Sequence, residues 1–298
     1  MAGSVEEKKG HQEIRYISLR RETEFETIYY YFKYHYLYLI HRRIKIITMD
    51  FSRFKSFVFD LDGTIWNWKE LLPGAKELLE NLRKKGKQVL FITNNTMLRR
   101  KDLVKKLKDF GVECKENELI SSAIAISEYI KFKGGKVFVI GENLKEDLKE
   151  EGIEVDEENP RYVVVGHDVD FNFNKLTSAV RYVKKGAELI AAAQGRYFVF
   201  GDEFIPGTGT IVKAIEYTCN KRAKLLGKPS DFMCHIVQLF VQSSRKETVV
   251  FGDELRADIG LAKKCGYFSV LVKTGVDKEV KGEIRPDLAI DSLMNVKI

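Results

Sequence analysis

The sequence predicts an α/β fold in which a Rossmann-like, doubly wound parallel sheet forms the core and a smaller α/β domain is inserted into it. From Met49 onward, short apolar runs of strand length alternate with helical patterns, which is typical of a parallel sheet covered by helices. A second unit of this kind occupies residues 119–204, so we expect the core to consist of residues 49–118 and 205–298. A chain of 298 residues is long enough for two domains with cores of their own.

The composition is typical of a globular protein, with 44% hydrophobic and 31% charged residues. The net charge of +7 is spread along the chain, because basic runs such as residues 105–108 alternate with acidic pairs such as residues 150–151. A nucleic-acid footprint needs clustered positive charge, so we expect no nucleic-acid partner.

The four cysteines, Cys114, Cys219, Cys234 and Cys265, form no C-x-x-C pair. Their isolation argues against a zinc ribbon or a redox motif. It fits buried thiols in a reducing compartment, and we therefore expect a cytoplasmic protein.

Residues 1–48 differ from the rest of the chain: they hold seven of the 13 tyrosines and three of the five histidines. Their apolar stretch, residues 28–40, is interrupted by Lys33 and His35, so it is too short and too polar to span a bilayer. No secretory pattern is visible. An interfacial aromatic helix is one interpretation. We favour an appended leader without a catalytic role. A sharper version of this interpretation takes Met49 as the true start.

The first strand of the core ends in two carboxylates. The apolar run Phe57–Phe59 predicts a buried strand, and Asp60 and Asp62 follow it one residue apart. Alternate side chains of a strand point the same way, so both carboxylates can face one spot, where their repulsion favours a divalent cation such as Mg²⁺. A calcium loop is excluded because Ile65 stands where its glycine is required. A solvated turn would be the default interpretation without support from elsewhere in the chain.

The next helix and strand end in a second polar segment. Pro73 opens a helix that Gly86 ends, and residues 88–92 predict a strand that runs into Thr93-Asn94-Asn95. A hydroxyl and two amides before a helix suit anion binding, although ordinary capping of that helix explains them equally well.

The inserted unit alternates strands and helices without a recognisable nucleotide loop. Its predicted helices cover residues 121–130, 144–151 and 175–185, and its predicted strands cover residues 136–140, 162–165 and 189–192. The cluster Gly166–Asp170 contains one histidine among acids. We interpret it as a loop between a strand and a helix, facing a substrate, rather than as a metal site.

The turn 204–210 ends the insertion. It lacks the lysine of a P-loop and is expected to lead back into the core.

Two further polar segments follow this turn. Lys228, between glycine and proline, could present a cation to a phosphate. The strand 248–251 ends in Asp253, with Asp258 five residues later. Ligands bind at this edge of open parallel sheets, which supports a shared site.

Four segments, in this order, resemble the four motifs of the haloacid dehalogenase superfamily: Asp60-Leu61-Asp62-Gly63-Thr64, Thr93-Asn94-Asn95, Gly227-Lys228-Pro229, and Gly252-Asp253 with Asp258. The α/β insertion between the second and third motifs is similar to that of the branch with NagD-like and 4-nitrophenylphosphatase-like enzymes. The resemblance covers residues 50–298 and implies a phosphatase whose insertion is a cap over the site.

The resemblance also implies a role for each motif residue. Asp60 would attack phosphorus to form an aspartyl-phosphate, and Asp62 would protonate the leaving group and then activate water. The Asp60 carboxylate, the Asp62 backbone carbonyl and Asp253 would bind Mg²⁺, and Asp258 would support this metal site. Thr93, the Asn94 backbone and Lys228 would bind the phosphate.

The substrate stays open, because residues 191–196 depart from the segment that ends the insertion in this branch. We expect a small phosphate ester, and sugar, glycol and nucleotide monophosphates are all options. A phosphomutase with the same chemistry and a non-catalytic module that binds a phosphorylated ligand are the alternatives. Members of this family often dimerise through the cap, so a homodimer is an option here.

Overall fold

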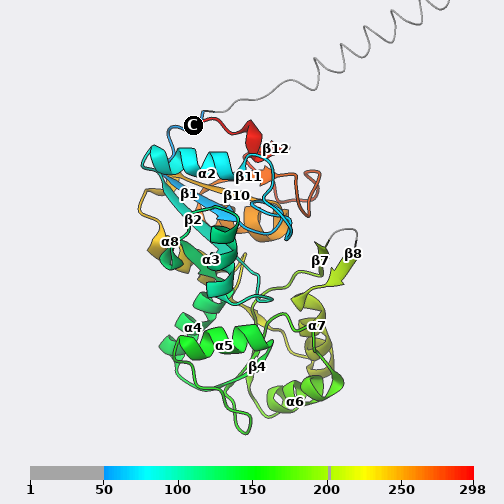
Figure 1. Ribbon diagram of the computed structural model, residues 1–298. Coiled ribbons are helices and arrows are strands. Elements are labelled where there is room, and N and C mark those ends of the chain that lie inside the picture. Colours follow the sequence, from blue (N-terminus) through cyan, green and yellow to red (C-terminus); the bar gives the residue numbers. More distant parts are fainter. Residues whose placement is uncertain (1–49, 201–202) are drawn as a thin grey trace, which may run out of the picture. The chain divides into compact units, whose positions relative to one another are not determined.

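The computed structural model describes residues 50–200 and 203–298 and contains a larger and a smaller parallel sheet (Figure 1). The larger sheet has six strands in the order β12-β11-β10-β1-β2-β3, and all neighbouring strands are parallel. They are β1 (Ser56–Asp60), β2 (Gln88–Thr93), β3 (Leu119–Ser121), β10 (Thr248–Gly252), β11 (Phe268–Val272) and β12 (Leu288–Ile290). The chain winds outward from β1 in both directions, so the predicted α/β, Rossmann-like core is confirmed.

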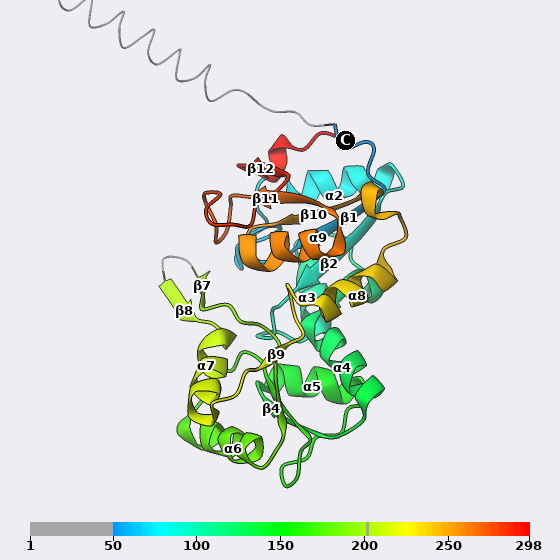
Figure 2. The same ribbon diagram turned by 180° about the vertical axis from the view of Figure 1, so that it is seen from behind.

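Every residue of β1 is buried, which shows that both faces of the larger sheet are covered. On the face with Phe57 and Phe59, the apolar side chains of α2 (Ala75–Lys84) and α3 (Arg100–Asp109) pack. On the face with Val58, α8 (Asp231–Phe240) and α9 (Gly260–Cys265) pack, as Figure 2 shows from behind. Alternating side chains of one strand thus supply both cores.

The helices α8 and α9 correct one expectation from the sequence. Cys234 of α8 and Cys265 of α9 form a disulfide, so the expectation of isolated thiols is wrong for these two cysteines. The spacing of 31 residues gave no signal, because packing of the two helices brings the cysteines together. Cys114 and Cys219 are free and buried, as expected.

The smaller sheet has four parallel strands in the order β4-β5-β6-β9. They are β4 (Val137–Ile140), β5 (Tyr162–Val165), β6 (Glu188–Ala191) and β9 (Lys224–Leu225). The helices α4 (Ser122–Lys133) and α5 (Glu142–Glu150) pack on one face, and α6 (Phe173–Lys184) and α7 (Thr208–Cys219) on the other. An antiparallel hairpin, β7 (Tyr197–Phe200) and β8 (Glu203–Pro206), extends from this unit (Figure 1).

The sheets place the boundaries of the insertion differently from the expected range 119–204. The strand β3 belongs to the larger sheet, whereas α7 and β9 belong to the smaller unit. The turn at 204–210 therefore does not lead back into the core, since the apolar stripe Ile211, Val212 and Ile215 packs against β5. We propose that the insertion, here called the cap, spans residues 122–226.

The expectations about residues 1–48 lie outside the described residues. Among the helices of residues 50–200 and 203–298, none is long and apolar enough to cross a membrane.

Candidate active site

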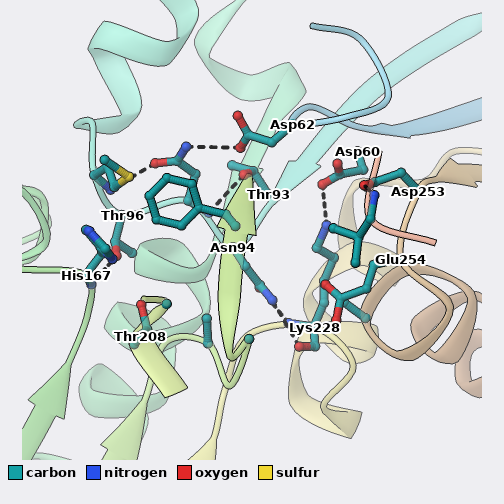
Figure 3. Close-up of a pocket in the computed structure, with 18 of the residues that line it drawn as sticks. Asp60, Asp62, Thr93, Asn94, Thr96, His167, Thr208, Lys228, Asp253 and Glu254 are labelled. Atoms are coloured by element: carbon teal, nitrogen blue, oxygen red, sulfur yellow. Dashed lines mark hydrogen bonds and ion pairs between the residues drawn. The ribbon is translucent and has the colours of Figure 1, made fainter. Parts of the chain in front are cut away.

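Three adjacent strands of the larger sheet deliver polar side chains to one edge. The strand β1 lies between β2 and β10, with Asp60 opposite Ile92 and Phe59 opposite Phe251. Asp60, Thr93 and Asp253 therefore emerge side by side where these strands end, and they line one cavity (Figure 3). The structure thus brings together the carboxylates and the hydroxyl that the strand ends predicted.

Lys228 lies at the centre of this group. Its Nζ is 2.5 Å from Asp60 Oδ1 and 2.6 Å from Asp258 Oδ1, and the side chain is only 3% exposed. The loop that carries Lys228 is fixed by Asn94, whose Oδ1 accepts from the Lys228 backbone N–H at 2.8 Å and whose Nδ2 donates to the Lys228 carbonyl at 3.0 Å. Asn94 thereby connects the second and third motifs (Figure 3).

Asp258 organises the loop after β10. Its Oδ2 accepts from the backbone N–H groups of Asp253 at 3.1 Å and Glu254 at 3.0 Å. Because its Oδ1 accepts from Lys228, both oxygens are engaged within the protein. This arrangement fits the supporting role that the sequence predicted for Asp258.

The site holds more negative than positive charge. Burial raises the pKa of Asp60 well above its usual range. Lys228 opposes this shift, and nearby carboxylates add to it. Burial and the charges of Asp60 and Asp258 also raise the pKa of Asp253 well above its usual range. The pKa of Lys228 is raised because Asp258 and Asp60 outweigh the opposing effect of burial. Glu254, which also lines the cavity, adds a carboxylate whose pKa burial raises to about 7.

This charge balance fits a divalent cation. Asp60, Asp253 and Asp258 each place one carboxylate oxygen within 4.8 Å of the others. In the described part of the chain, Lys228 is the one buried lysine or arginine, so three buried carboxylates face a single buried positive charge. Clustered carboxylate oxygens are the ligands that Mg²⁺ takes, and such an ion would remove the excess charge.

Asp62 lies beside this group and is held at both carboxylate oxygens. Trp66 Nε1 donates to Oδ1 at 2.7 Å. Asn95 Nδ2 donates to Oδ2 at 3.0 Å, which is the dashed line that ends on Asp62 in Figure 3. Burial raises the pKa of Asp62 although both hydrogen bonds oppose this effect. The sequence predicted no role for Trp66 and no separate role for Asn95.

Aromatic side chains form part of the cavity lining. The cavity has a volume of about 160 Å³, and Trp68, Met97, His167 and Phe198 are among the residues that line it. The Phe198 ring lies 5.3 Å from the His167 ring and 6.4 Å from the Trp68 ring, between centroids. The hairpin that carries Phe198 has no counterpart in the predicted elements.

Two segments that the sequence singled out in the insertion reach this cavity in part. Of the cluster Gly166–Asp170, His167 lines the cavity, whereas Asp168 pairs with Lys175 at 2.7 Å, which supports a loop rather than a metal site. Of the departed segment 191–196, Ala193 and Gly195 line the cavity.

The cap is attached to the loop that follows Thr93-Asn94-Asn95. Thr96 Oγ1 accepts from the His167 backbone N–H at 2.7 Å, and Asn143 Nδ2 donates to the Met97 carbonyl at 2.5 Å. The buried Asp147 of α5 accepts at 3.0 Å from the backbone N–H of Arg100, the first residue of α3. A carboxylate from the cap thus caps a helix of the core.

Known protein families match the two ends of the described region. A model described as haloacid dehalogenase-like hydrolase matches residues 57–154, and a second model of HAD-like hydrolases matches residues 225–296.

Individual proteins are similar over most of the chain. Chronophin from Homo sapiens is 31% identical over 76% of this chain and 83% of its own length. Ribonucleotide monophosphatase NagD from Escherichia coli K12 is 29% identical over 74% of this chain and 88% of its own length. The crystal structure of a 4-nitrophenylphosphatase from Thermotoga maritima superimposes with a TM-score of 0.75, at 30% identity, over 82% of this chain and 96% of that one.

Proposed function

The chain belongs to the haloacid dehalogenase-like hydrolases, and from this premise we propose that it is a Mg²⁺-dependent phosphatase of small phosphomonoesters that works through an aspartyl-phosphate. Relatives named as 4-nitrophenylphosphatase, ribonucleotide monophosphatase and 5'-nucleotidase support this reaction class. The observation that carries the proposal is the buried Asp60 carboxylate, which lines the cavity between Lys228 and Asp253.

The first half of the reaction transfers the phosphoryl group to the protein. An oxygen of Asp60 forms a bond to phosphorus while the bond from phosphorus to the leaving oxygen breaks, and the carboxyl group of Asp62 gives its proton to that oxygen. Lys228, the Thr93 hydroxyl and the Asn94 backbone N–H bind the phosphate oxygens, whose charge redistributes in the transition state.

The second half returns the protein to its starting state. Asp62, now a carboxylate, takes a proton from water while the water oxygen bonds to phosphorus. The bond between phosphorus and Asp60 breaks, and inorganic phosphate leaves. The carboxylates of Asp60 and Asp253 and the backbone carbonyl of Asp62 would hold Mg²⁺, with Asp258 fixing the Asp253 loop. The ion supplies positive charge to the phosphate oxygens.

Removal of the metal tests the proposal directly. We expect phosphate release from 4-nitrophenyl phosphate with Mg²⁺, near-complete loss in excess EDTA, and recovery when Mg²⁺ is added back. Ca²⁺ serves as the control, because it takes more ligands at longer distances than the octahedral Mg²⁺, so we expect it to restore less activity. Full activity of the EDTA-treated, metal-free protein would contradict the metal requirement. Absence of turnover across a broad panel of phosphomonoesters would contradict the phosphatase.

The aromatic wall of the cavity predicts a preference among substrates. 2-Phenylethyl and 2-cyclohexylethyl phosphate have leaving groups of similar size and basicity, but only the first offers a flat ring to Phe198, Trp68 and His167. Contacts between aromatic rings contribute about 0.5–1.5 kcal/mol, so we expect kcat/KM to be roughly 2- to 10-fold higher for the phenyl compound. Phe198→Leu should reduce this ratio toward one, whereas Phe132→Leu, on the exposed surface of the cap, should leave it unchanged. Equal kcat/KM values with the unchanged protein would contradict the prediction.

A homodimer formed through the cap, a cytoplasmic location and the lack of a nucleic-acid partner stay predictions. The same holds for the choice among sugar, glycol and nucleotide monophosphates as physiological substrates.

A further inference from the structure

Each carboxylate oxygen of Asp62 accepts a hydrogen bond from the side chain of another residue. Trp66 Nε1 lies 2.7 Å from Oδ1 and Asn95 Nδ2 lies 3.0 Å from Oδ2. The two donors come from different segments, the loop after β1 and the loop after β2. A carboxyl group held at both oxygens cannot rotate about its Cβ–Cγ bond without losing one of these hydrogen bonds.

The amide of Asn95 can act only as a donor toward Asp62. Its Oδ1 accepts from the backbone N–H of Met97 at 2.9 Å and of Leu98 at 3.3 Å. Its backbone N–H donates to Thr93 Oγ1 at 2.9 Å. With the carbonyl oxygen engaged by the turn, the NH₂ group is the half of the amide that faces Asp62.

Trp66 is fixed as firmly as Asn95. The side chain is fully buried, and its ring lies 6.0 Å from the Phe110 ring and 5.2 Å from Lys106 Nζ, measured to the ring centroid. Its backbone closes the loop, because the Trp66 carbonyl accepts from the Gly63 N–H at 2.8 Å. An indole N–H can only donate, so Trp66 contacts Asp62 as a hydrogen-bond donor, and the fixed ring determines the direction of that bond.

We infer that Trp66 and Asn95 are positioning residues that aim the carboxyl group of Asp62 at the leaving-group oxygen. The inference rests on the proposed function, in which this carboxyl group gives its proton to that oxygen and later takes one from water. Each donor occupies one lone-pair direction on its oxygen, so the proton is confined to the directions that remain. Neither residue touches the phosphate in this role.

This role predicts a dependence on the leaving group that a purely structural role lacks. A 4-nitrophenolate is a stable anion and needs little protonation as it departs, whereas an alkoxide needs a proton. Because kcat/KM reports the steps up to the first irreversible one, it isolates the transfer to Asp60 from the later attack by water. Misdirection of Asp62 should therefore slow alkyl phosphates much more than 4-nitrophenyl phosphate.

The test compares kcat/KM of Trp66→Phe for 2-phenylethyl phosphate and 4-nitrophenyl phosphate. The phenyl ring retains contact with Phe110 and Lys106 but lacks the N–H. General acid catalysis contributes about 10²- to 10⁴-fold, so we expect roughly a 10-fold or greater loss for the alkyl ester and less than about 3-fold for the nitrophenyl ester. Asn95→Asp is the second variant, because it retains the acceptor for Met97 and Leu98 and replaces the donor by a repelling oxygen. Asn95→Asp should show the same selectivity with a larger loss.

Tyr182→Phe is the matched control, since it removes a hydroxyl that donates to the Glu157 carbonyl from a buried side chain that does not line the cavity. It should affect both esters equally or not at all. Equal losses on both esters in Trp66→Phe and Asn95→Asp, or no loss in either folded variant, would overturn the inference and leave the phosphatase intact. Lack of turnover of both esters by the unchanged protein would instead overturn the proposed function.

Discussion

Asp60→Asn is expected to reduce phosphate release by about 10³-fold or more, because an amide cannot serve as the nucleophile at the centre of the site. The substitution keeps the shape of the side chain and removes one of the buried carboxylates that repel one another. The Lys228–Asp258 pair remains, at 2.6 Å. The variant should therefore unfold at the same temperature as the unchanged protein or at a higher one. Phosphate release with Mg²⁺ and thermal unfolding would be measured on the same preparation.

Asp109→Asn is the matched control, since Asp109 lies exposed at the end of α3 and its one ion pair with a described residue is to Lys105. It should retain full activity. An active Asp60→Asn protein would contradict the role of Asp60 as the nucleophile, and an unfolded one would contradict the expected stability. Incubation with substrate followed by mass measurement adds a direct readout, because only the unchanged protein should gain a phosphoryl group.

Lys228→Met is expected to impair stability and activity together. Loss of the lysine leaves Asp60 and Asp258 buried and facing each other without a cation, and breaking a buried ion pair in this way costs about 3–5 kcal/mol. Mg²⁺ should restore part of that stability, since it supplies positive charge to the same carboxylates. We therefore expect the unfolding temperature to rise more with Mg²⁺ in Lys228→Met than in the unchanged protein.

Lys264→Met provides the comparison on the surface. Lys264 pairs with Asp231, whose side chain is 91% exposed, and exposed pairs contribute only about 0–1 kcal/mol. A similar unfolding temperature for Lys228→Met and Lys264→Met in EDTA would show that the buried pair contributes nothing to the fold. A Lys228→Met protein with normal KM and kcat would exclude Lys228 from phosphate binding.

Part of the site was predictable because Asp60, Thr93 and Asp253 each follow an apolar run. Parallel strands end at one edge, so Asp60, Thr93 and Asp253 had to meet once their strands were identified. Lys228 follows no such rule. Its place depends on the Asn94 side chain, which holds the loop from a distance of 134 residues in the sequence.

Other features had no local signal. The strand β9 is two residues long, and nothing in Lys224–Leu225 distinguishes it from a loop, so no local pattern indicates the later cap boundary that we propose. The disulfide depends on how α8 and α9 pack. In the sequence, Trp66 next to Ile65 resembles an ordinary core residue. Its hydrogen bond to Asp62 depends on a tight loop whose shape is set by backbone hydrogen bonds.

The attachment of the cap to the core limits how the two parts can be recombined. A chimaera that joined this core to the cap of a relative would need an acceptor where Asp147 meets Arg100 and a donor where the His167 backbone meets Thr96. Without them, buried polar groups of the core would lose their partners at a cost of about 1–3 kcal/mol each. The loop disturbed by such a junction is the one that carries Asn95. We therefore expect an exchange of caps to change the orientation of Asp62 as well as the choice of substrate. The cap and the second motif would have to be exchanged together.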